Sequence, residues 1–438
     1  MVLASLKLKR CLEYKPRFVF RIETIMKPKQ KLVVIGNGMA GMRTIEELLS
    51  AAPEQYDITV FGAEPYGNYN RIMLSAVLCG DKTIEDIVIN NRQWYIDNNI
   101  TLHAGESKAV ISIERGLQKV IAKDGTTTDY DRLLIATGSK AIVPDVVGND
   151  LDGVISFRDI FDVNKMLDYS RSHKKAVVLG GGLLGLEAAN GLVLRGMDVA
   201  VIHNNAVLLN RQIDKPAGQL LQTELEKKGI KFKMAAKLSG LVGDENNHIT
   251  TVSFEDGSEL DCDLFIMAIG VRPNIALAQQ AGLYCERGIV VDDTLQSYDP
   301  SIYAVGECIQ HRGDTFGLVA PLFEQAKVCA NHLSAHGVAE YITLPTATKL
   351  KVTGIHLFSI GDIQGDEQCE NLCFSDSALG IYKKLVLKND KLVGAVLYGD
   401  TADGVWYQQL LEQETPIIEL RDEVIFGKAY AERFNSNC

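Results

Sequence analysis

Three glycines in the segment KLVVIGNGMAG have a spacing that suits a bound phosphate group. Gly36, Gly38 and Gly41 follow the pattern G-x-G-x-x-G. In this pattern the first glycine makes a tight turn, the second lets the backbone approach a pyrophosphate, and the third lets a helix lie close to a strand. The N–H groups and partial positive charge at the start of that helix attract phosphates. The spacing therefore predicts a dinucleotide-binding turn.

The elements around this turn agree with that prediction. The apolar run 32–35 predicts a buried parallel strand, and apolar residues recur at helical period over 42–49. A second strand is predicted over 57–61, and Glu64 follows it, 23 residues after Gly41. A carboxylate at that place can accept hydrogen bonds from a ribose 2′-OH.

The same pattern recurs 144 residues later in the chain. A predicted strand over 175–179 leads into a second set of spaced glycines, Gly180, Gly182 and Gly185, and a helix is predicted after them. The next predicted strand, 198–202, ends at His203 instead of an acid. Two further predicted strands close one fold each, and they end at Thr137, Gly138 and Gly270. The chain is therefore predicted to contain two dinucleotide folds.

Two such sites favour one tightly held cofactor and one exchangeable cofactor. A flavin can take a hydride from a nicotinamide and release electrons singly, which NADH cannot readily do. The predicted strand 301–307 ends at Glu307, whose carboxylate would reach the ribityl chain of a flavin in the first fold. The two folds are therefore predicted to hold one flavin and one exchangeable nicotinamide cofactor.

The composition is that of an ordinary globular protein. The 438 residues are 46% hydrophobic and 23% charged, which at roughly 150 residues per domain suits about three domains. No stretch approaches the roughly 18 apolar residues of a membrane helix, so we expect a soluble protein. A net charge of −11 argues against nucleic acid as a partner. The nine scattered cysteines do not form a disulfide framework, which favours a reducing compartment, the cytoplasm.

Residues 1–29 form an N-terminal extension of different composition. The first 30 residues carry eight Lys or Arg and two acids, a net charge of +6, so that the remaining 408 carry −17. No apolar region typical of a secretory signal follows. We interpret the segment as an upstream extension with Met26 as the natural start. A basic arm for an acidic partner is the alternative.

Several segments resemble known flavoprotein reductases. The run FGAEPYGNYNRIMLS over 61–75 is similar to a segment of nitrite reductase large subunits and rubredoxin reductase-like proteins. Gly306-Glu307-Cys308, the run 317–321 and parts of 348–401 are also similar to the nitrite reductase large subunit. Over about residues 30–340 the chain resembles the FAD-dependent pyridine nucleotide-disulfide oxidoreductases, which include glutathione reductase.

The resemblance assigns roles to the residues of the first fold. It implies that FAD lies there, with the three glycines and Glu64 on its ADP half and with Thr137 and Gly138 near it. Glu307, where the family usually has Asp, would bind the ribityl hydroxyls. Arg71 would reach the FAD pyrophosphate, and a salt bridge within its loop is the alternative.

The resemblance also implies that the second fold binds NAD(P)H. Glu187 would lie near the nicotinamide amide, and a solvated helix residue is the alternative. His203 stands where an acid would select NADH, and no arginine adjoins it to favour the 2′-phosphate of NADPH. We expect NADH, with NADPH as the alternative. Stacking on the adenine and capping of the strand are simpler roles for His203.

The cysteines argue against a dithiol mechanism. Disulfide reductases of this superfamily carry C-x-x-x-x-C, whereas LSAVLCG has only Cys79. We interpret Cys79 as a small apolar packing residue, with a single redox thiol as the alternative. Cys369 and Cys373 lack further ligands at metal spacing, so we predict no metal site. Hydride transfer itself needs no acid–base group, and we predict no catalytic side chain.

We expect an α/β protein with two Rossmann-like domains, the NAD domain being inserted in the FAD domain. Residues 30–142 and 268–340 would form the FAD-binding domain, and 143–267 the NAD(P)H-binding domain. Residues 341–438 would form a small α+β interface domain with a hairpin over 381–398. In relatives this last domain lies near the flavin.

The predicted activity is electron transfer from NAD(P)H through FAD to a redox protein. After residue 340 the chain has three cysteines, fewer than the four thiolates of an iron–sulfur cluster. We therefore expect the electrons to leave to a nitrate or nitrite reductase subunit. A rubredoxin or ferredoxin reductase of another pathway is the alternative, and a flavin-based redox sensor is less favoured. The sequence leaves a homo-oligomer open.

Overall fold

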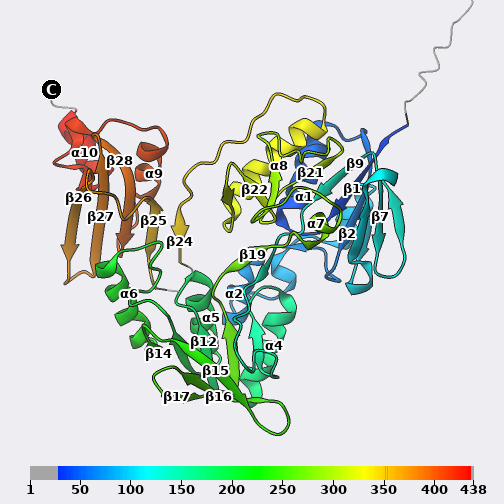
Figure 1. The fold of residues 1–438 in the computed structure, drawn as a ribbon. Coiled ribbons are helices and arrows are strands. Elements are labelled where there is room, and N and C mark those ends of the chain that lie inside the picture. Colours follow the sequence, from blue (N-terminus) through cyan, green and yellow to red (C-terminus); the bar gives the residue numbers. More distant parts are fainter. Residues whose placement is uncertain (1–27, 351, 353, 436–438) are drawn as a thin grey trace, which may run out of the picture.

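A five-stranded parallel sheet forms the first unit (Figure 1). The computed structural model describes residues 28–350, 352 and 354–435. Met26 and all of the predicted extension before residue 28 therefore lie outside the described residues. The sheet has the order β21-β9-β1-β2-β5. Its strands are β1 (Gln30–Ile35), β2 (Tyr56–Gly62), β5 (Thr101–Ala104), β9 (Arg132–Ile135) and β21 (Ile302–Ala304). Because β21 comes from a distant part of the chain, the second unit is inserted between β9 and β21.

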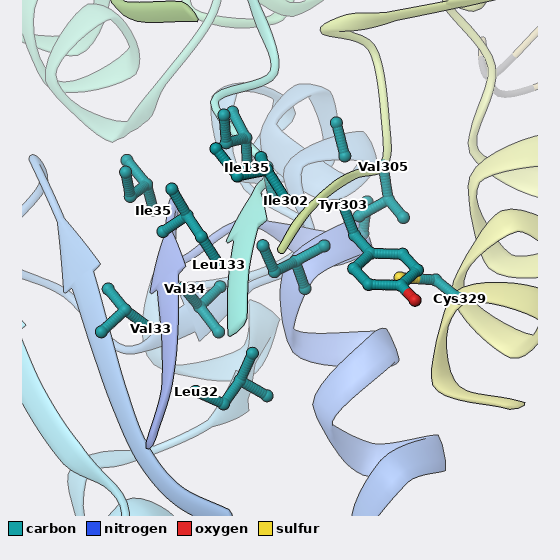
Figure 2. Packing of buried hydrophobic residues seen from close by; sticks show 14 of the residues in the cluster. Leu32, Val33, Val34, Ile35, Leu133, Ile135, Ile302, Tyr303, Val305 and Cys329 are labelled. Atoms are coloured by element: carbon teal, nitrogen blue, oxygen red, sulfur yellow. The ribbon is translucent and has the colours of Figure 1, made fainter. Parts of the chain in front are cut away.

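The apolar strands of this sheet form one core with the helices beside it. Figure 2 shows side chains of β1, β9 and β21 in one cluster, with Cys329 of α8 (Val319–Leu333) beside Tyr303. Helix α1 (Met39–Ala51), which follows β1, contacts α8. Leu32, Val34 and Leu133 are fully buried. Strands buried on both faces are typical of parallel sheets covered by helices, as the apolar run over 32–35 predicts.

The second unit repeats this organisation. Its parallel sheet has the order β11-β18-β12-β13-β14. The strands are β11 (Val154–Ser156), β12 (Lys175–Leu179), β13 (Asp198–Ile202), β14 (Ile230–Lys233) and β18 (Leu264–Met267), and the helices are α4 (Ile160–Ser172), α5 (Leu183–Leu194) and α6 (Lys215–Lys227). The predicted α/β class with two Rossmann-like folds is therefore confirmed.

Each unit also has a three-stranded antiparallel sheet, and smaller elements complete the first unit. The antiparallel sheets are β6 (Val110–Glu114), β7 (Lys119–Ala122) and β8 (Thr127–Asp129) in the first unit, and β15 (Leu238–Gly243), β16 (Ile249–Phe254) and β17 (Glu259–Asp261) in the second. The smaller elements are β3 (Asn68–Tyr69), β4 (Val88–Asn90), α3 (Arg92–Asp97), α7 (Ala276–Gln280), β20 (Ile289–Val291), β22 (Ile309–His311) and β23 (Asp314–Thr315).

Two features join the units. The chain passes between them through β10 (Ser139–Ala141) and β19 (Val271–Pro273), which pair antiparallel with each other. Helix α2 (Leu74–Cys79) of the first unit contacts α4 and α5 of the second. A Cβ added to Gly191 on α5 would lie 2.7 Å from Leu78 of α2, so the two helices are in close contact there. Arg195 donates to the Leu78 carbonyl at the end of α2 at 2.7 Å.

The C-terminal unit is an antiparallel sheet with two helices, α9 (Gly404–Glu412) and α10 (Lys428–Asn435). Its strand order is β24-β25-β28-β27-β26. The strands are β24 (Thr348–Lys349), β25 (Leu357–Gly361), β26 (Glu370–Asp376), β27 (Ile381–Lys388) and β28 (Lys391–Tyr398). The predicted hairpin is present as β27–β28, with positive φ at Asn389 (51°) and Asp390 (57°) in its turn.

The C-terminal unit packs on the second unit, and its nearness to a bound flavin stays a prediction. Figure 1 shows its sheet beside α6 and apart from α1 and α8. Apolar residues of the C-terminal unit, such as Val396 and Tyr398, share a core with Leu221 and Leu225 of α6. The face of β25, β27 and β28 turned away from α9 combines apolar side chains, which pack on α6, with a few buried polar ones.

Candidate functional site

The glycines of the first turn serve two different needs. Gly36 has φ +115°, which a side chain would strain, and a Cβ there would overlap the carbonyl oxygen of Ala136. A Cβ on Gly41 would lie 2.9 Å from the Gly36 carbonyl oxygen. A Cβ on Gly38, by contrast, would have no protein atom within 4 Å. At Gly36 and Gly41 the missing side chain lets neighbouring backbone segments approach closely, whereas Gly38 borders free space.

The second turn has the same geometry. Gly180 has φ +122°, and a Cβ there would overlap the carbonyl oxygen of Ala268. A Cβ on Gly185 would overlap Gly180, and one on Gly182 would have nothing within 4 Å. Helices α1 and α5 begin directly after Gly38 and Gly182, and neither has a side-chain cap. The free space and the uncapped N–H groups fit the pyrophosphate of FAD at the first turn and of NAD(P)H at the second.

An ion pair connects the carboxyl ends of the two parallel sheets, where such sheets bind ligands. Arg158 follows β11 of the second sheet, and Glu307 follows β21 of the first. The Arg158 guanidinium pairs with the Glu307 carboxylate, and the Ser139 hydroxyl donates to the same carboxylate at 2.7 Å. The two charged side chains are 21% and 14% exposed. Gly138 lies beside them, since a Cβ there would be 3.8 Å from Arg158 Nη2.

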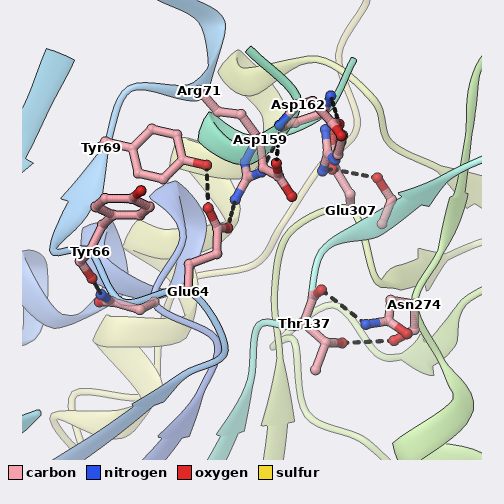
Figure 3. Close-up of polar contacts among 12 residues, drawn as sticks. Glu64, Tyr66, Tyr69, Arg71, Thr137, Asp159, Asp162, Asn274 and Glu307 are labelled. Carbon is pink, nitrogen blue, oxygen red and sulfur yellow. Dashed lines mark hydrogen bonds and ion pairs between the residues drawn. The ribbon is translucent and has the colours of Figure 1, made fainter. Parts of the chain in front are cut away.

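A second polar group surrounds Glu64 (Figure 3). Arg71 Nη2 lies 2.7 Å from Glu64 Oε1, and the Tyr69 hydroxyl donates to Oε2 at 2.7 Å. Arg71 also donates to the Arg158 carbonyl at 2.8 Å. Burial alone would lower the pKa of the Arg71 guanidinium, but Tyr69 and Glu64 raise it above its ordinary value. The loop salt bridge is therefore present. Contacts of Arg71 with a pyrophosphate and of Glu64 with a ribose stay predictions.

Thr137 lies at the passage between the units (Figure 3). Its hydroxyl donates to the Asn274 carbonyl at 2.8 Å, and the Asn274 N–H donates to the Gly138 carbonyl at 2.8 Å. Gly270, on the return passage, has φ +116°. Thr137, Gly138 and Glu307 are thus close to one another at the carboxyl end of the first sheet.

Glu187 and His203 belong to the second unit. Glu187 on α5 is only 7% exposed, so it is not a solvated helix residue. His203 Nδ1 accepts the N–H of Gly181 in the glycine turn at 3.2 Å, which assigns the proton of the neutral ring to Nε2. Burial lowers the pKa of His203, so the ring stays neutral at pH 7. His203 therefore holds the glycine turn through a direct hydrogen bond. Its influence on NADH selection stays a prediction.

Sequence reasoning missed Arg158, Tyr69, Ser139 and Asn274. Arg158 and Glu307 are 149 residues apart, and the strand before Arg158 has only three residues. The signal that could have found Arg158 is its place after a strand, because residues at the carboxyl ends of parallel strands face the ligand site.

Cys79 lies at the end of α2, against α5. Asn190 Nδ2 is 3.7 Å from its sulfur, and the side chain is partly buried. Burial raises the pKa of the Cys79 thiol, whereas reactive cysteines have a lowered pKa. These observations favour the packing interpretation. In the described part of the chain, no three His, Cys, Asp or Glu side chains are arranged to hold a metal ion.

We expect Cys79→Ala to keep NADH:ferricyanide turnover within about twofold of wild type, because a thiol with a raised pKa is a poor redox centre. Steady-state kinetics at saturating NADH measure this. Cys285→Ala, at another partly buried cysteine, is the control for loss of any thiol. A collapse of turnover in the Cys79 variant alone would show that this thiol takes part in the reaction.

Fold and site together define a protein with two facing dinucleotide folds. The chain belongs to the pyridine nucleotide-disulphide oxidoreductase family, whose family model matches residues 30–332. A second model, the rubredoxin NAD⁺ reductase C-terminal domain, matches residues 346–415. Among the described residues, no helix combines the length and apolarity needed to cross a membrane.

Particular relatives carry the comparison further. The chain is 46% identical over 391 residues to a nitrite reductase [NAD(P)H] of Bacillus subtilis, covering 89% of this chain and 48% of that protein. It is 44% identical over 407 residues to the assimilatory nitrate reductase electron transfer subunit of the same species, covering 92% and 51%. The chain thus spans about half the length of these relatives. A ferredoxin reductase from Rhodopseudomonas palustris shares the fold, with a TM-score of 0.81, 24% identity and coverage of 89% and 96%.

Proposed function

We propose that this chain is an FAD-dependent NAD(P)H oxidoreductase that passes electrons to a redox protein of an assimilatory nitrate or nitrite reductase system. The observation that carries the proposal is the ion pair between Arg158 and Glu307, which brings the ligand-binding ends of the two parallel sheets together. A cofactor at one glycine turn would then meet a cofactor at the other. The names of the two Bacillus relatives support the nitrate or nitrite pathway.

The chain's own groups would bind and orient the two cofactors. FAD, when bound, would accept a hydride from NAD(P)H and release electrons one at a time. The N–H groups of α1 and α5 would hold the two pyrophosphates. Glu307, fixed by Arg158 and Ser139, would face the ribityl chain, and Glu187 would lie at the nicotinamide end. Hydride transfer needs correct positioning more than proton transfer, which agrees with a site built of turns and ion pairs.

NADH is the proposed nicotinamide cofactor. The neutral His203 supplies no positive charge to pair with the 2′-phosphate of NADPH. The cytoplasm is the proposed location.

The decisive experiment is reduction of the purified, FAD-reconstituted protein. We expect an absorbance band near about 450 nm that NADH bleaches, and a higher kcat/KM for NADH than for NADPH with ferricyanide as acceptor. A colourless protein after reconstitution would overturn the proposal. A strong NADPH preference would overturn the cofactor assignment alone.

A rubredoxin or ferredoxin reductase of another pathway is the second candidate, favoured by the match of residues 346–415 to the rubredoxin reductase C-terminal model. The preferred electron acceptor distinguishes these two candidate functions. Faster turnover with a purified nitrate or nitrite reductase subunit than with rubredoxin or ferredoxin supports the first proposal, and the reverse order supports the second.

A further inference from the structure

The loop between β13 and α6, residues 203–214, is interlocked with the second glycine turn. The N–H of Leu209 donates to the Gly181 carbonyl at 2.9 Å, and the N–H of Gly181 donates to His203 at 3.2 Å. A Cβ on Gly181 would lie 2.7 Å from Leu208 and 2.9 Å from His203. Leu208 and Leu209 are buried. The loop and the turn therefore cannot shift independently.

The far end of this loop is held by the C-terminal unit. The Tyr382 hydroxyl on β27 donates to Asp214 Oδ2 at 2.6 Å, and Lys384 Nζ lies 3.9 Å from the same oxygen. The Ser359 hydroxyl on β25 donates to the Gln212 carbonyl. Tyr382, Lys384 and Ser359 are buried, so these polar contacts are shielded from water. Asp214 is also the N-cap of α6, where it accepts from the Ala217 N–H at 3.4 Å.

Burial and the bond to Asp214 raise the pKa of Tyr382. The phenol therefore keeps its proton and stays a donor at neutral pH. A hydrogen bond to a carboxylate is among the stronger kinds, and removing one donor from the partly buried Asp214 carboxylate is unfavourable. The contact is thus a fixed attachment of loop 203–214 to the C-terminal sheet.

We propose that the C-terminal unit is part of the NAD(P)H site and that Tyr382 is a positioning residue for it. Through Asp214, Tyr382 holds loop 203–214, and the loop holds Gly181 in the turn that would face the pyrophosphate. The path runs through contacts already described, from Tyr382 to Asp214, along the loop to Leu209, and from there to Gly181. The inference rests on the proposed binding of NAD(P)H at the second fold.

Tyr382→Phe tests the attachment, and Tyr398→Phe is a matched control. Tyr398 lies on the neighbouring strand at the same interface, but its hydroxyl donates to the Leu220 carbonyl within α6, at 3.5 Å. Both variants remove one hydroxyl, and only the first touches the loop. In the FAD-loaded protein, we expect Tyr382→Phe to weaken NAD⁺ binding about threefold to tenfold, the size of coupling typical of such networks.

The kinetic readout separates positioning from general damage. We expect the KM for NADH to rise with the NAD⁺ dissociation constant in the Tyr382 variant, while kcat and flavin content stay at wild-type values. Amide hydrogen exchange over residues 203–214 should become faster in this variant. The Tyr398 variant should match wild type in all of these measurements.

Unchanged NAD⁺ affinity in Tyr382→Phe would overturn the inference, as would unchanged exchange in the loop or a fall in kcat without a change in KM. Equal effects in both tyrosine variants would also overturn it, because the loop contact would then have no special role. Failure of the proposed function is distinguishable, since wild-type protein would then neither bind NAD⁺ nor be reduced by NADH.

Discussion

Gly38→Ala and Gly182→Ala should separate the two cofactors. We expect Gly38→Ala to weaken FAD binding about tenfold to a hundredfold, because a methyl group forced into a close contact costs about 1–3 kcal/mol. A Cβ at either position meets no protein atom within 4 Å, so only a bound ligand would clash with it. Because Ala is a poorer N-cap than Gly, each change should also cost about 0.5–1 kcal/mol in protein stability. Flavin content after dialysis and fluorescence titration with FAD measure the effect.

Gly182→Ala is the reciprocal control for this experiment. It should keep its flavin and lose affinity for NADH by a similar factor, measured as KM in the ferricyanide assay. If Gly38→Ala retained FAD as tightly as wild type, the first turn would not be the pyrophosphate site. Loss of flavin from the Gly182 variant would contradict the assignment of the second turn.

Arg158→Ala should destabilise the protein by about 1–3 kcal/mol, because it leaves the partly buried Glu307 carboxylate without its charged partner. The side chain of Arg158 has no other hydrogen bond among the described residues, so the change removes this ion pair alone. Urea unfolding of the FAD-loaded protein measures the loss. We also expect slower flavin reduction by NADH in a stopped-flow experiment, because the pair joins the two cofactor units.

Two controls test the attribution to this ion pair. Arg312→Ala removes an exposed arginine, 69% accessible, that pairs with Asp293 at 2.6 Å. A surface pair contributes at most about 1 kcal/mol, so this variant should remain near wild type. In Arg158→Ala combined with Glu307→Gln, the total loss should be smaller than the sum of the two single losses. Strict additivity would show that the two side chains do not depend on each other.

Local patterns in the sequence were sufficient for the two folds and their turns. The glycine spacing around Gly36 and Gly180 and the apolar strands before them are properties of short segments. The hairpin at Asn389 and Asp390 was equally readable, because turn residues between two apolar runs determine it. The resemblance to flavoprotein reductases also predicted the class of protein, and the family match confirms it.

The contacts between units could not be predicted in this way. Arg158 and Glu307 meet only because two short strands end at facing sheet edges, and no local pattern records that pairing. Tyr382 lies in a strand that reads as ordinary buried core, so its bond to Asp214 is visible only once α6 is placed beside β27. For Arg71, the sequence left both a pyrophosphate contact and a loop salt bridge open, because a charged loop residue has several partners within reach. The structure shows its pairing with Glu64.

The pairing of β10 with β19 also bears on how the molecule could be taken apart. Ala141 faces Val271 across this ribbon, so the chain leaves for the inserted unit and comes back at adjacent points. If the inserted unit were replaced by a short turn between these two residues, closing the remaining chain would cost little entropy. The same ribbon is a natural graft point, where a foreign nucleotide-binding module with neighbouring ends could be spliced in to change the electron donor.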